Sequence, residues 1–169
     1  MNEKKKPNYQ NAVKEARDAL LFHFGIEENI KIPVPLEKVI QENKLKLVYA
    51  DFSSVPKPAT GALSRKDNKI FINNVDTIPR QLFTAAHELG HFILHKDIED
   101  DVLYRSTNPF QVKDPKEQEA NAFAAELLMP ANQVIKYWDK YNDLDTMCEL
   151  FRVSKQAMQF RLSFLGLSE

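Results

Sequence analysis

The stretch AAHELGHFILH, residues 85–95, contains three of the four histidines of this 169-residue chain. A spacing of four residues places His87, His91 and His95 on one face of an α-helix, with about 6 Å of rise between neighbours. His87, Glu88 and His91 match the pattern HExxH, in which two histidines bind one metal ion and the glutamate acts as a base toward water. A core helix with histidines in register by chance is the alternative, but so specific a pattern favours the metal site.

His95 continues the same stripe but is not expected to bind the same ion. It lies two turns, about 12 Å along the axis, from His87, which is too far for one continuous helix to bring both to a single ion. A charge or hydrogen bond near the helix C-terminus is the expected role. The longer pattern HExxHxxGxxH is excluded because Leu94 and Asp97 occupy its glycine and histidine positions. The third ligand must therefore come from another segment.

A second helix, predicted to begin after Asp114, offers two carboxylates as the third ligand. Glu117 shares a face with small residues such as Ala120 and Ala124, which must pack inward, whereas Glu119 falls on the opposite side. Because a buried carboxylate needs a partner, this geometry favours Glu117 as a ligand. A competing interpretation makes Asp114 and Glu117 a capping pair. Zn²⁺ is the expected ion, although two histidines and a carboxylate also suit Mn²⁺ or Fe²⁺.

The first half of the chain has the pattern of two helices followed by three strands. Apolar side chains recur at helical spacing from Tyr9 to Phe24, Gly25 is a plausible stop, and a shorter helix follows Pro35. Branched and aromatic residues indicate strands in LKLVYADF, GALSR and KIFIN, and turn residues at 66–68 join the last two. We therefore expect a small antiparallel sheet in the middle of the chain.

Helices dominate the second half. The HExxH helix is predicted to begin after Asp76 or Thr77 and to run to about Lys96, and Pro130 closes the next helix. Residues 97–113 between them have little periodicity and are expected to form a long loop. Helices, then a small sheet, then helices is an order typical of the α+β class rather than of alternating α/β folds.

Composition excludes several classes of protein. Twenty-three basic and 24 acidic residues nearly cancel, so net charge does not argue for nucleic acid or a membrane surface as partner. Cys148 is the only cysteine, which excludes an intrachain disulfide framework and an all-cysteine metal site. The start, MNEKKKPNYQ, does not have the form of a secretory signal, and no apolar run is long enough to span a bilayer. A soluble, cytoplasmic protein is expected.

The C-terminal segment LDTMCELFRVSKQAMQFRLSFLGL has the shape of a helix-turn-helix, with Ser154 capping its second helix. A DNA-binding or regulatory module with a non-proteolytic metal site is therefore the alternative function. From Ala131 to the end, however, the sequence contains five basic and five acidic residues, so this segment has no net positive charge. Because a duplex-binding surface should have a basic excess, we favour a packing or substrate-docking role for this segment.

Three motifs in order, AAHELGHFILH, EQEANAFAAELLMP and FRVSKQAMQFRLSFLGL, resemble the ImmA/IrrE family of metallo-endopeptidases, over roughly residues 30–167. The resemblance implies that His87, His91 and Glu117 bind the metal, that Glu88 is the catalytic base and that Asn121 supports a histidine from outside the ligand set.

The resemblance also implies a zincin-like α+β metallopeptidase domain over residues 1–130 and a helix-turn-helix-like helical subdomain over residues 131–169. Members of the family are encoded largely by bacteria, phages and integrative elements. The implied function is zinc-dependent cleavage of a cytoplasmic helix-turn-helix repressor, which derepresses mobile-element or stress genes.

Peptide hydrolysis needs two further features besides the base. A donor must stabilise the developing oxyanion, and Tyr104 in the predicted loop is a candidate, although an ordinary packed tyrosine is the favoured interpretation. The strand GALSR could present an edge to an extended substrate peptide, and a paired core strand is the alternative.

Overall fold

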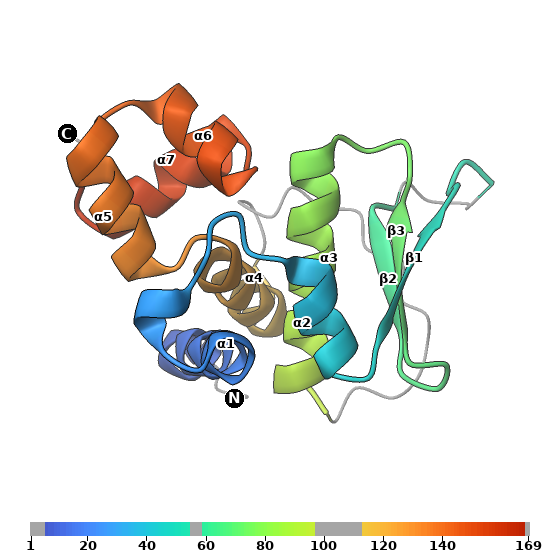
Figure 1. The fold of residues 1–169 in the computed structure, drawn as a ribbon. Coiled ribbons are helices and arrows are strands. Elements are labelled where there is room, and N and C mark those ends of the chain that lie inside the picture. The colour runs from blue at the N-terminus through green and yellow to red at the C-terminus, as the bar shows by residue number, and fades with distance from the viewer. Residues whose placement is uncertain (1–5, 55–58, 97–112, 168–169) are drawn as a thin grey trace.

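In the computed structural model, which describes residues 6–54, 59–96 and 113–167, helices and a small sheet form a mixed α+β fold (Figure 1). The prediction of the α+β class is therefore confirmed. The predicted loop, with Tyr104, lies almost entirely outside the described residues. The elements are α1 (Tyr9–Phe24), the 3₁₀ turn η1 (Glu27–Asn29), α2 (Leu36–Glu42), β1 (Lys46–Ala50), β2 (Gly61–Ser64), β3 (Lys69–Asn73), α3 (Ile78–Leu94), α4 (Pro115–Leu128), α5 (Ala131–Tyr141), α6 (Leu144–Phe151) and α7 (Lys155–Phe164).

Local sequence signals account for several helix ends. The Asn8 side chain accepts a hydrogen bond from the backbone N–H of Asn11 and begins α1, and the helix stops at Gly25, as predicted. Ser154 caps α7 in the same way, by accepting from the N–H of Ala157. Thr77 precedes α3 without a side-chain capping bond; instead, Gln81 Nε2 donates to backbone carbonyls that precede the helix.

The sheet differs from the predicted antiparallel one. β2 and β3 form the expected antiparallel hairpin, but β1 pairs with β3 in parallel, and the strand order is β1-β3-β2. The prediction assumed that each strand pairs with the next along the chain. Instead, β3 is central, and its Ile70 and Ile72 are fully buried, whereas Tyr49 of the edge strand β1 is half exposed. β3 thus has a strand partner on both sides, parallel on one and antiparallel on the other, and the sheet is mixed.

α3 lies between the sheet and α4 (Figure 1), and a glycine permits the close approach on each side. A Cβ added to Gly61 of β2 would lie 2.4 Å from Cγ2 of Thr84 on α3. A Cβ added to Gly90 of α3 would lie 3.1 to 3.2 Å from side-chain atoms of Phe123 on α4. A glycine inside a helix costs about 1 kcal/mol relative to alanine, and at Gly90 this cost is offset by tight packing of the two helices.

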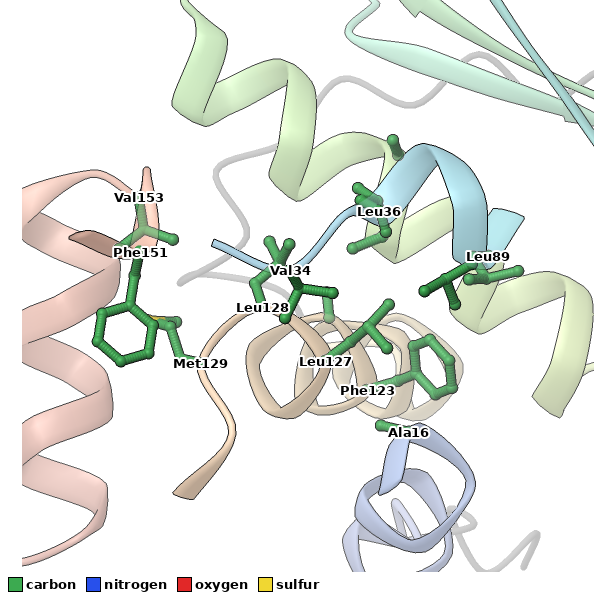
Figure 2. Close-up of a cluster of buried hydrophobic side chains, with 14 of the residues drawn as sticks. Ala16, Val34, Leu36, Leu89, Phe123, Leu127, Leu128, Met129, Phe151 and Val153 are labelled. Atoms are coloured by element: carbon green, nitrogen blue, oxygen red, sulfur yellow. The ribbon is translucent and has the colours of Figure 1, made fainter. Parts of the chain in front are cut away.

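A single hydrophobic cluster joins the elements, including the C-terminal helices. Figure 2 shows Phe123 and Leu127 of α4 at its centre, with Leu89 of α3 on one side and Ala16 of α1 on another. Met129, just after α4, packs toward Phe151 and Val153 (Figure 2). The C-terminal helices therefore share a core with the rest of the chain, and the division at residue 130 stays a prediction.

A buried ion pair also ties α7 to α4. Arg161 bonds the carboxylate of Glu126 and donates from Nε to the carbonyl of Met129 at 2.9 Å. The other Glu126 oxygen accepts from Arg17 of α1 at 2.9 Å, and this interaction raises the pKa of the Arg17 guanidinium. Removing one partner of such a buried pair would leave an uncompensated charge in the core. No helix within the described ranges is both long and apolar enough to cross a membrane.

The fit of α3 against the sheet predicts the effect of Gly61→Ala. The added methyl group would overlap Thr84 Cγ2, so we expect a loss of about 1–3 kcal/mol in the free energy of unfolding. Thr84→Ser removes Cγ2, and the double variant should be more stable than Gly61→Ala alone. Urea unfolding of the metal-free proteins, with Thr84→Ser alone as control, measures both effects. No relief in the double variant would contradict the assigned contact.

Candidate metal centre

α3 supplies three of the predicted site residues. His87, Glu88 and His91 lie in its second half and are buried, with Glu88 fully so. The helix is held at both ends: Gln81 bonds the chain that enters it, and Arg65, in the turn after β2, bonds carbonyls at its end. The two histidine side chains project from one face, as the four-residue spacing predicts, and their Nε2 atoms lie 3.0 Å apart.

Glu117, in the first turn of α4, reaches both histidines. Its carboxylate oxygens lie 3.2 Å from His87 Nε2 and 3.3 Å from His91 Nε2. Asp114 caps this helix, and its side chain accepts from the N–H of Lys116 at 2.7 Å. The structure thus brings His87, His91 and Glu117 together as a group with one ligand atom each, all within 4.8 Å of one another.

The donor atoms fit a divalent metal ion. Ligand atoms bound to one zinc ion at about 2.0–2.1 Å, at tetrahedral angles, lie about 3.3 Å apart. The two Nε2 atoms are 3.0 Å apart, and each lies 3.2 or 3.3 Å from a different oxygen of the Glu117 carboxylate. Two imidazoles and one carboxylate also form a ligand set typical of catalytic zinc, in which a fourth position is left for water or substrate. The same set accepts Mn²⁺ or Fe²⁺, so the donors fit a metal without selecting its identity.

The separation of α3 and α4 decides whether Glu117 can reach the histidines. Gly90 lies between Glu88 and His91 in sequence, and its missing side chain allows Phe123 to pack directly against the backbone of α3. Phe123 is itself fully buried, so it has little room to withdraw. The glycine of HELGH therefore helps to set the geometry of the centre.

Asn121, one turn after Glu117, contacts His87 from the side away from the centre. Its Oδ1 lies 2.8 Å from His87 Nδ1. Because an amide oxygen can only accept, Nδ1 of a neutral His87 carries the proton and the Nε2 lone pair faces Glu117 and His91. This tautomer is the one that binds a metal through Nε2. Asn121 therefore lies where the sequence analysis expects a supporting residue.

The contacts of Glu119 were not predicted from the sequence, which placed this side chain only on the side opposite Glu117. Glu119 is outside the ligand group, but its Oε2 lies 2.8 Å from Nε2 of the buried His95, which immediately follows α3. His95 Nδ1 lies in turn 2.9 Å from His91 Nδ1. The helical periodicity assigned Glu119 to the side opposite Glu117, yet α4 packs against both α1 and α3, so both sides meet protein. The sequence signal for the contact between His91 and His95 was their four-residue spacing, which places both side chains on the same face of the helix.

Arg65 is a positioning residue that the sequence analysis missed. Its guanidinium donates to the carbonyls of His91 at 2.6 Å, Phe92 at 3.1 Å and His95 at 2.8 Å. The last carbonyls of a helix lack partners within the helix, and a cation there is favoured by the helix dipole. Arg65 thus fixes the turn that carries His91 and His95. In the sequence it is only a charge at the end of the predicted strand GALSR, which gives no sign of this role.

An apolar pocket of about 440 Å³ lies beside the centre. It is bounded by α1, α3, α4 and α7, and Asn121, which contacts His87, forms part of its wall. Phe83, Phe160 and Phe164 contribute aromatic surface. A pocket of this size and character accepts apolar groups of a ligand.

Comparison with known proteins places the chain in a family. Residues 40–163 match the peptidase M78 family, described as the IrrE N-terminal-like domain. Metallopeptidase ImmA of Bacillus subtilis (strain 168) is 30% identical over 95 residues, which are 54% of this chain and 54% of that protein. The chain thus matches about half the length of this curated relative.

A solved structure described as a Mycobacterium tuberculosis transcriptional regulator has a similar fold, with a TM-score of 0.62 and 16% identity over 91% of this chain and 46% of that one. At this identity the likeness concerns the fold alone. The match of the family over most of the chain carries the assignment: this chain belongs to the ImmA/IrrE family of metallopeptidases.

Proposed function

We propose that the chain is a zinc-dependent endopeptidase in which His87, His91 and Glu117 bind the ion and Glu88 is the catalytic base. The observation that carries the proposal is the convergence of two imidazole nitrogens and one carboxylate, beside a fully buried glutamate in the HExxH position. The domain over residues 1–130 would hold this centre, with residues 131–169 as a helical subdomain. Mn²⁺ or Fe²⁺ would suit the same donors, and elemental analysis of the purified protein identifies the ion.

Each residue has a definable task in this reaction. A divalent metal in the centre supplies Lewis-acid activation of water and polarisation of the peptide carbonyl. Glu88 takes the proton of the attacking water and passes it to the leaving amine. Asn121 holds His87 in the tautomer whose Nε2 faces the centre. Tyr104 stays the candidate oxyanion donor, although it lies outside the described residues.

An extended substrate would bind along β2. This strand pairs with β3 on one side, and in the described part of the chain no strand pairs with its other edge. An extended peptide can add a strand at such an edge through main-chain hydrogen bonds. β2 also packs against α3 through Gly61 and Thr84, so a peptide added here lies near the helix that carries the centre.

We further propose that the substrate is a cytoplasmic helix-turn-helix repressor encoded by a phage, an integrative element or a stress-response locus. This step rests on the ImmA/IrrE resemblance and on membership of the family. A repressor gene beside the gene for this chain would identify the substrate to use in the experiments below.

The alternative is DNA binding through α6 and α7. It is disfavoured because two cations of α7 form ion pairs with carboxylates of the same chain. Lys155 Nζ lies 2.5 Å from Asp145 Oδ1, and this interaction raises the pKa of the Lys155 ammonium group. Arg161 is buried and bonds Glu126. Two of the five cations after residue 130 therefore already pair with carboxylates, and the other three are not in excess over the remaining acidic residues of the segment.

The proposed base predicts that Glu88→Gln abolishes cleavage while metal content is unchanged. Loss of a general base costs about 10²–10⁴-fold in rate, and the substitution removes no ligand. Zinc content and cleavage of the neighbouring repressor, followed by mass spectrometry, are measured on one preparation. Undiminished cleavage would remove Glu88 from the mechanism, whereas loss of zinc would make it structural.

The proposed ligand set predicts that Glu117→Gln lowers zinc affinity by more than about 100-fold, because a neutral amide replaces an anionic ligand. If Glu117 only capped α4, the variant would lose a little stability and keep its zinc, since glutamine also serves in a capping box. Titration against a competing chelator distinguishes the two. Glu149→Gln, a remote neutralisation on α6, is the matched control and should bind zinc as the wild type does.

The DNA alternative predicts that Lys155→Glu abolishes operator binding, whereas our proposal predicts little specific binding to lose. Arg161 is not a usable test position, because its replacement would leave Glu126 buried without this partner. Binding to the neighbouring operator is measured at two salt concentrations. Tight, site-specific binding by the wild type that weakens steeply with salt would favour the DNA-binding function.

A further inference from the structure

We propose that His95 and Glu119 form a positioning pair that fixes the tautomer and orientation of His91, and so raises the affinity of the centre for its metal. The inference rests on the proposed metal site but not on the proteolytic step. It gives a task to the third histidine of the stripe and to the second glutamate of EQEAN.

Three side chains form a continuous line behind the centre. His91 Nδ1 lies 2.9 Å from His95 Nδ1, and His95 Nε2 lies 2.8 Å from Glu119 Oε2. A carboxylate can only accept, so Nε2 of His95 donates to Glu119. In a neutral His95 the Nδ1 atom then carries a lone pair and accepts from Nδ1–H of His91. The Nε2 lone pair of His91 is thereby directed at Glu117 and His87, where a metal would bind.

Burial of the two histidines and hydrogen bonds to their neighbours favour a single placement of the protons in this line. His91 and His95 are 1% and 3% exposed, so a wrongly placed proton would have little access to water as a substitute partner. The other oxygen of Glu119 accepts from the backbone N–H of Asn8 at 2.7 Å, which ties the carboxylate to the start of α1. At the opposite end, Arg65 holds the carbonyls of His91 and His95.

The two histidine ligands therefore have different support. His87 is oriented by the neutral amide of Asn121, whereas His91 is linked through His95 to an anionic carboxylate. A carboxylate bonded directly to a ligating histidine makes that ligand more basic as well as orienting it, and loss of such a partner typically costs 10–100-fold in metal affinity. Here His95 relays the hydrogen bond between Glu119 and His91. The charge of Glu119 should thus act at the metal without contact between them.

A purely structural role is the rival explanation, since the pair also joins α3 to α4 and α1. Another His–carboxylate pair in the same chain separates the two explanations. His23 Nδ1 lies 2.7 Å from Glu42 Oε1, between α1 and α2, and neither residue belongs to the metal centre. Glu42→Gln therefore neutralises the carboxylate of a His–carboxylate pair that has no proposed link to the metal ion.

The experiment compares Glu119→Gln, Glu42→Gln, His95→Phe and the double variant His95→Phe/Glu119→Gln. Zinc affinity is measured against a chelator, and unfolding of the metal-free proteins is measured separately. We expect Glu119→Gln and His95→Phe each to lose about 10–100-fold in affinity, and Glu42→Gln to lose none. Because Glu119 acts through His95, its replacement in the His95→Phe background should cause no further loss.

Nitrogen-15 spectra of the histidine rings in the metal-free wild type provide a test that needs no variant. We expect His91 to carry its proton on Nδ1, and this preference to weaken in Glu119→Gln. An Nε2–H tautomer in the wild type, wild-type affinity in Glu119→Gln, or additive losses in the double variant would each overturn the inference. A wild type that binds no zinc would instead overturn the proposed metal site, and a zinc-binding but inactive wild type would overturn only the proposed proteolysis.

Discussion

The contact between α3 and α4 at Gly90 and Phe123 is the constraint on which the centre depends. The two histidines of α3 can be placed by a single helix, but the carboxylate that completes the group comes from a second one, and its reach is only a few ångströms. A Cβ at position 90 would lie 3.1 to 3.2 Å from side-chain atoms of Phe123, which is fully buried. Glycine inside a helix has a conformational cost, but at position 90 it allows the close packing of α3 and α4, in which the carboxylate oxygens of Glu117 lie 3.2 and 3.3 Å from the histidine nitrogens.

The C-terminal helices contribute to this constraint from a distance. The buried pair of Arg161 and Glu126 joins α7 to the end of α4, while Met129 packs toward Phe151 and Val153 (Figure 2). α4 is thus held by the C-terminal helices at one end and by α3 and α1 along its length. This use of Arg161 also explains why the helix-turn-helix pattern predicted from the sequence need not imply DNA binding, because a buried cation that bonds a carboxylate cannot contact a phosphate.

Patterns of short range predicted much of the fold. The end of α1 at Gly25, the cap at Ser154, the hairpin of β2 and β3 and the α+β class all depend on neighbouring residues, and the structure agrees with each. The parallel pairing of β1 with β3 was missed because strand order depends on which strand is buried in the assembled protein. The role of Arg65 was invisible for a similar reason, since its acceptors lie 26 to 30 residues away in the sequence.

The fate of the two glutamates of EQEAN shows what periodicity can and cannot decide. The apolar stripe correctly separated their directions: Glu117 faces the histidine nitrogens of the centre and Glu119 does not. A direction away from Glu117 does not place Glu119 in water, because α4 packs against both α1 and α3 and its side chains meet protein in both directions. Both carboxylate oxygens of Glu119 have hydrogen-bond partners, the backbone N–H of Asn8 and Nε2 of His95, which compensate the burial of the carboxylate. Through His95 and then His91, the carboxylate of Glu119 is linked to the position that a cation would occupy, with two imidazoles between them.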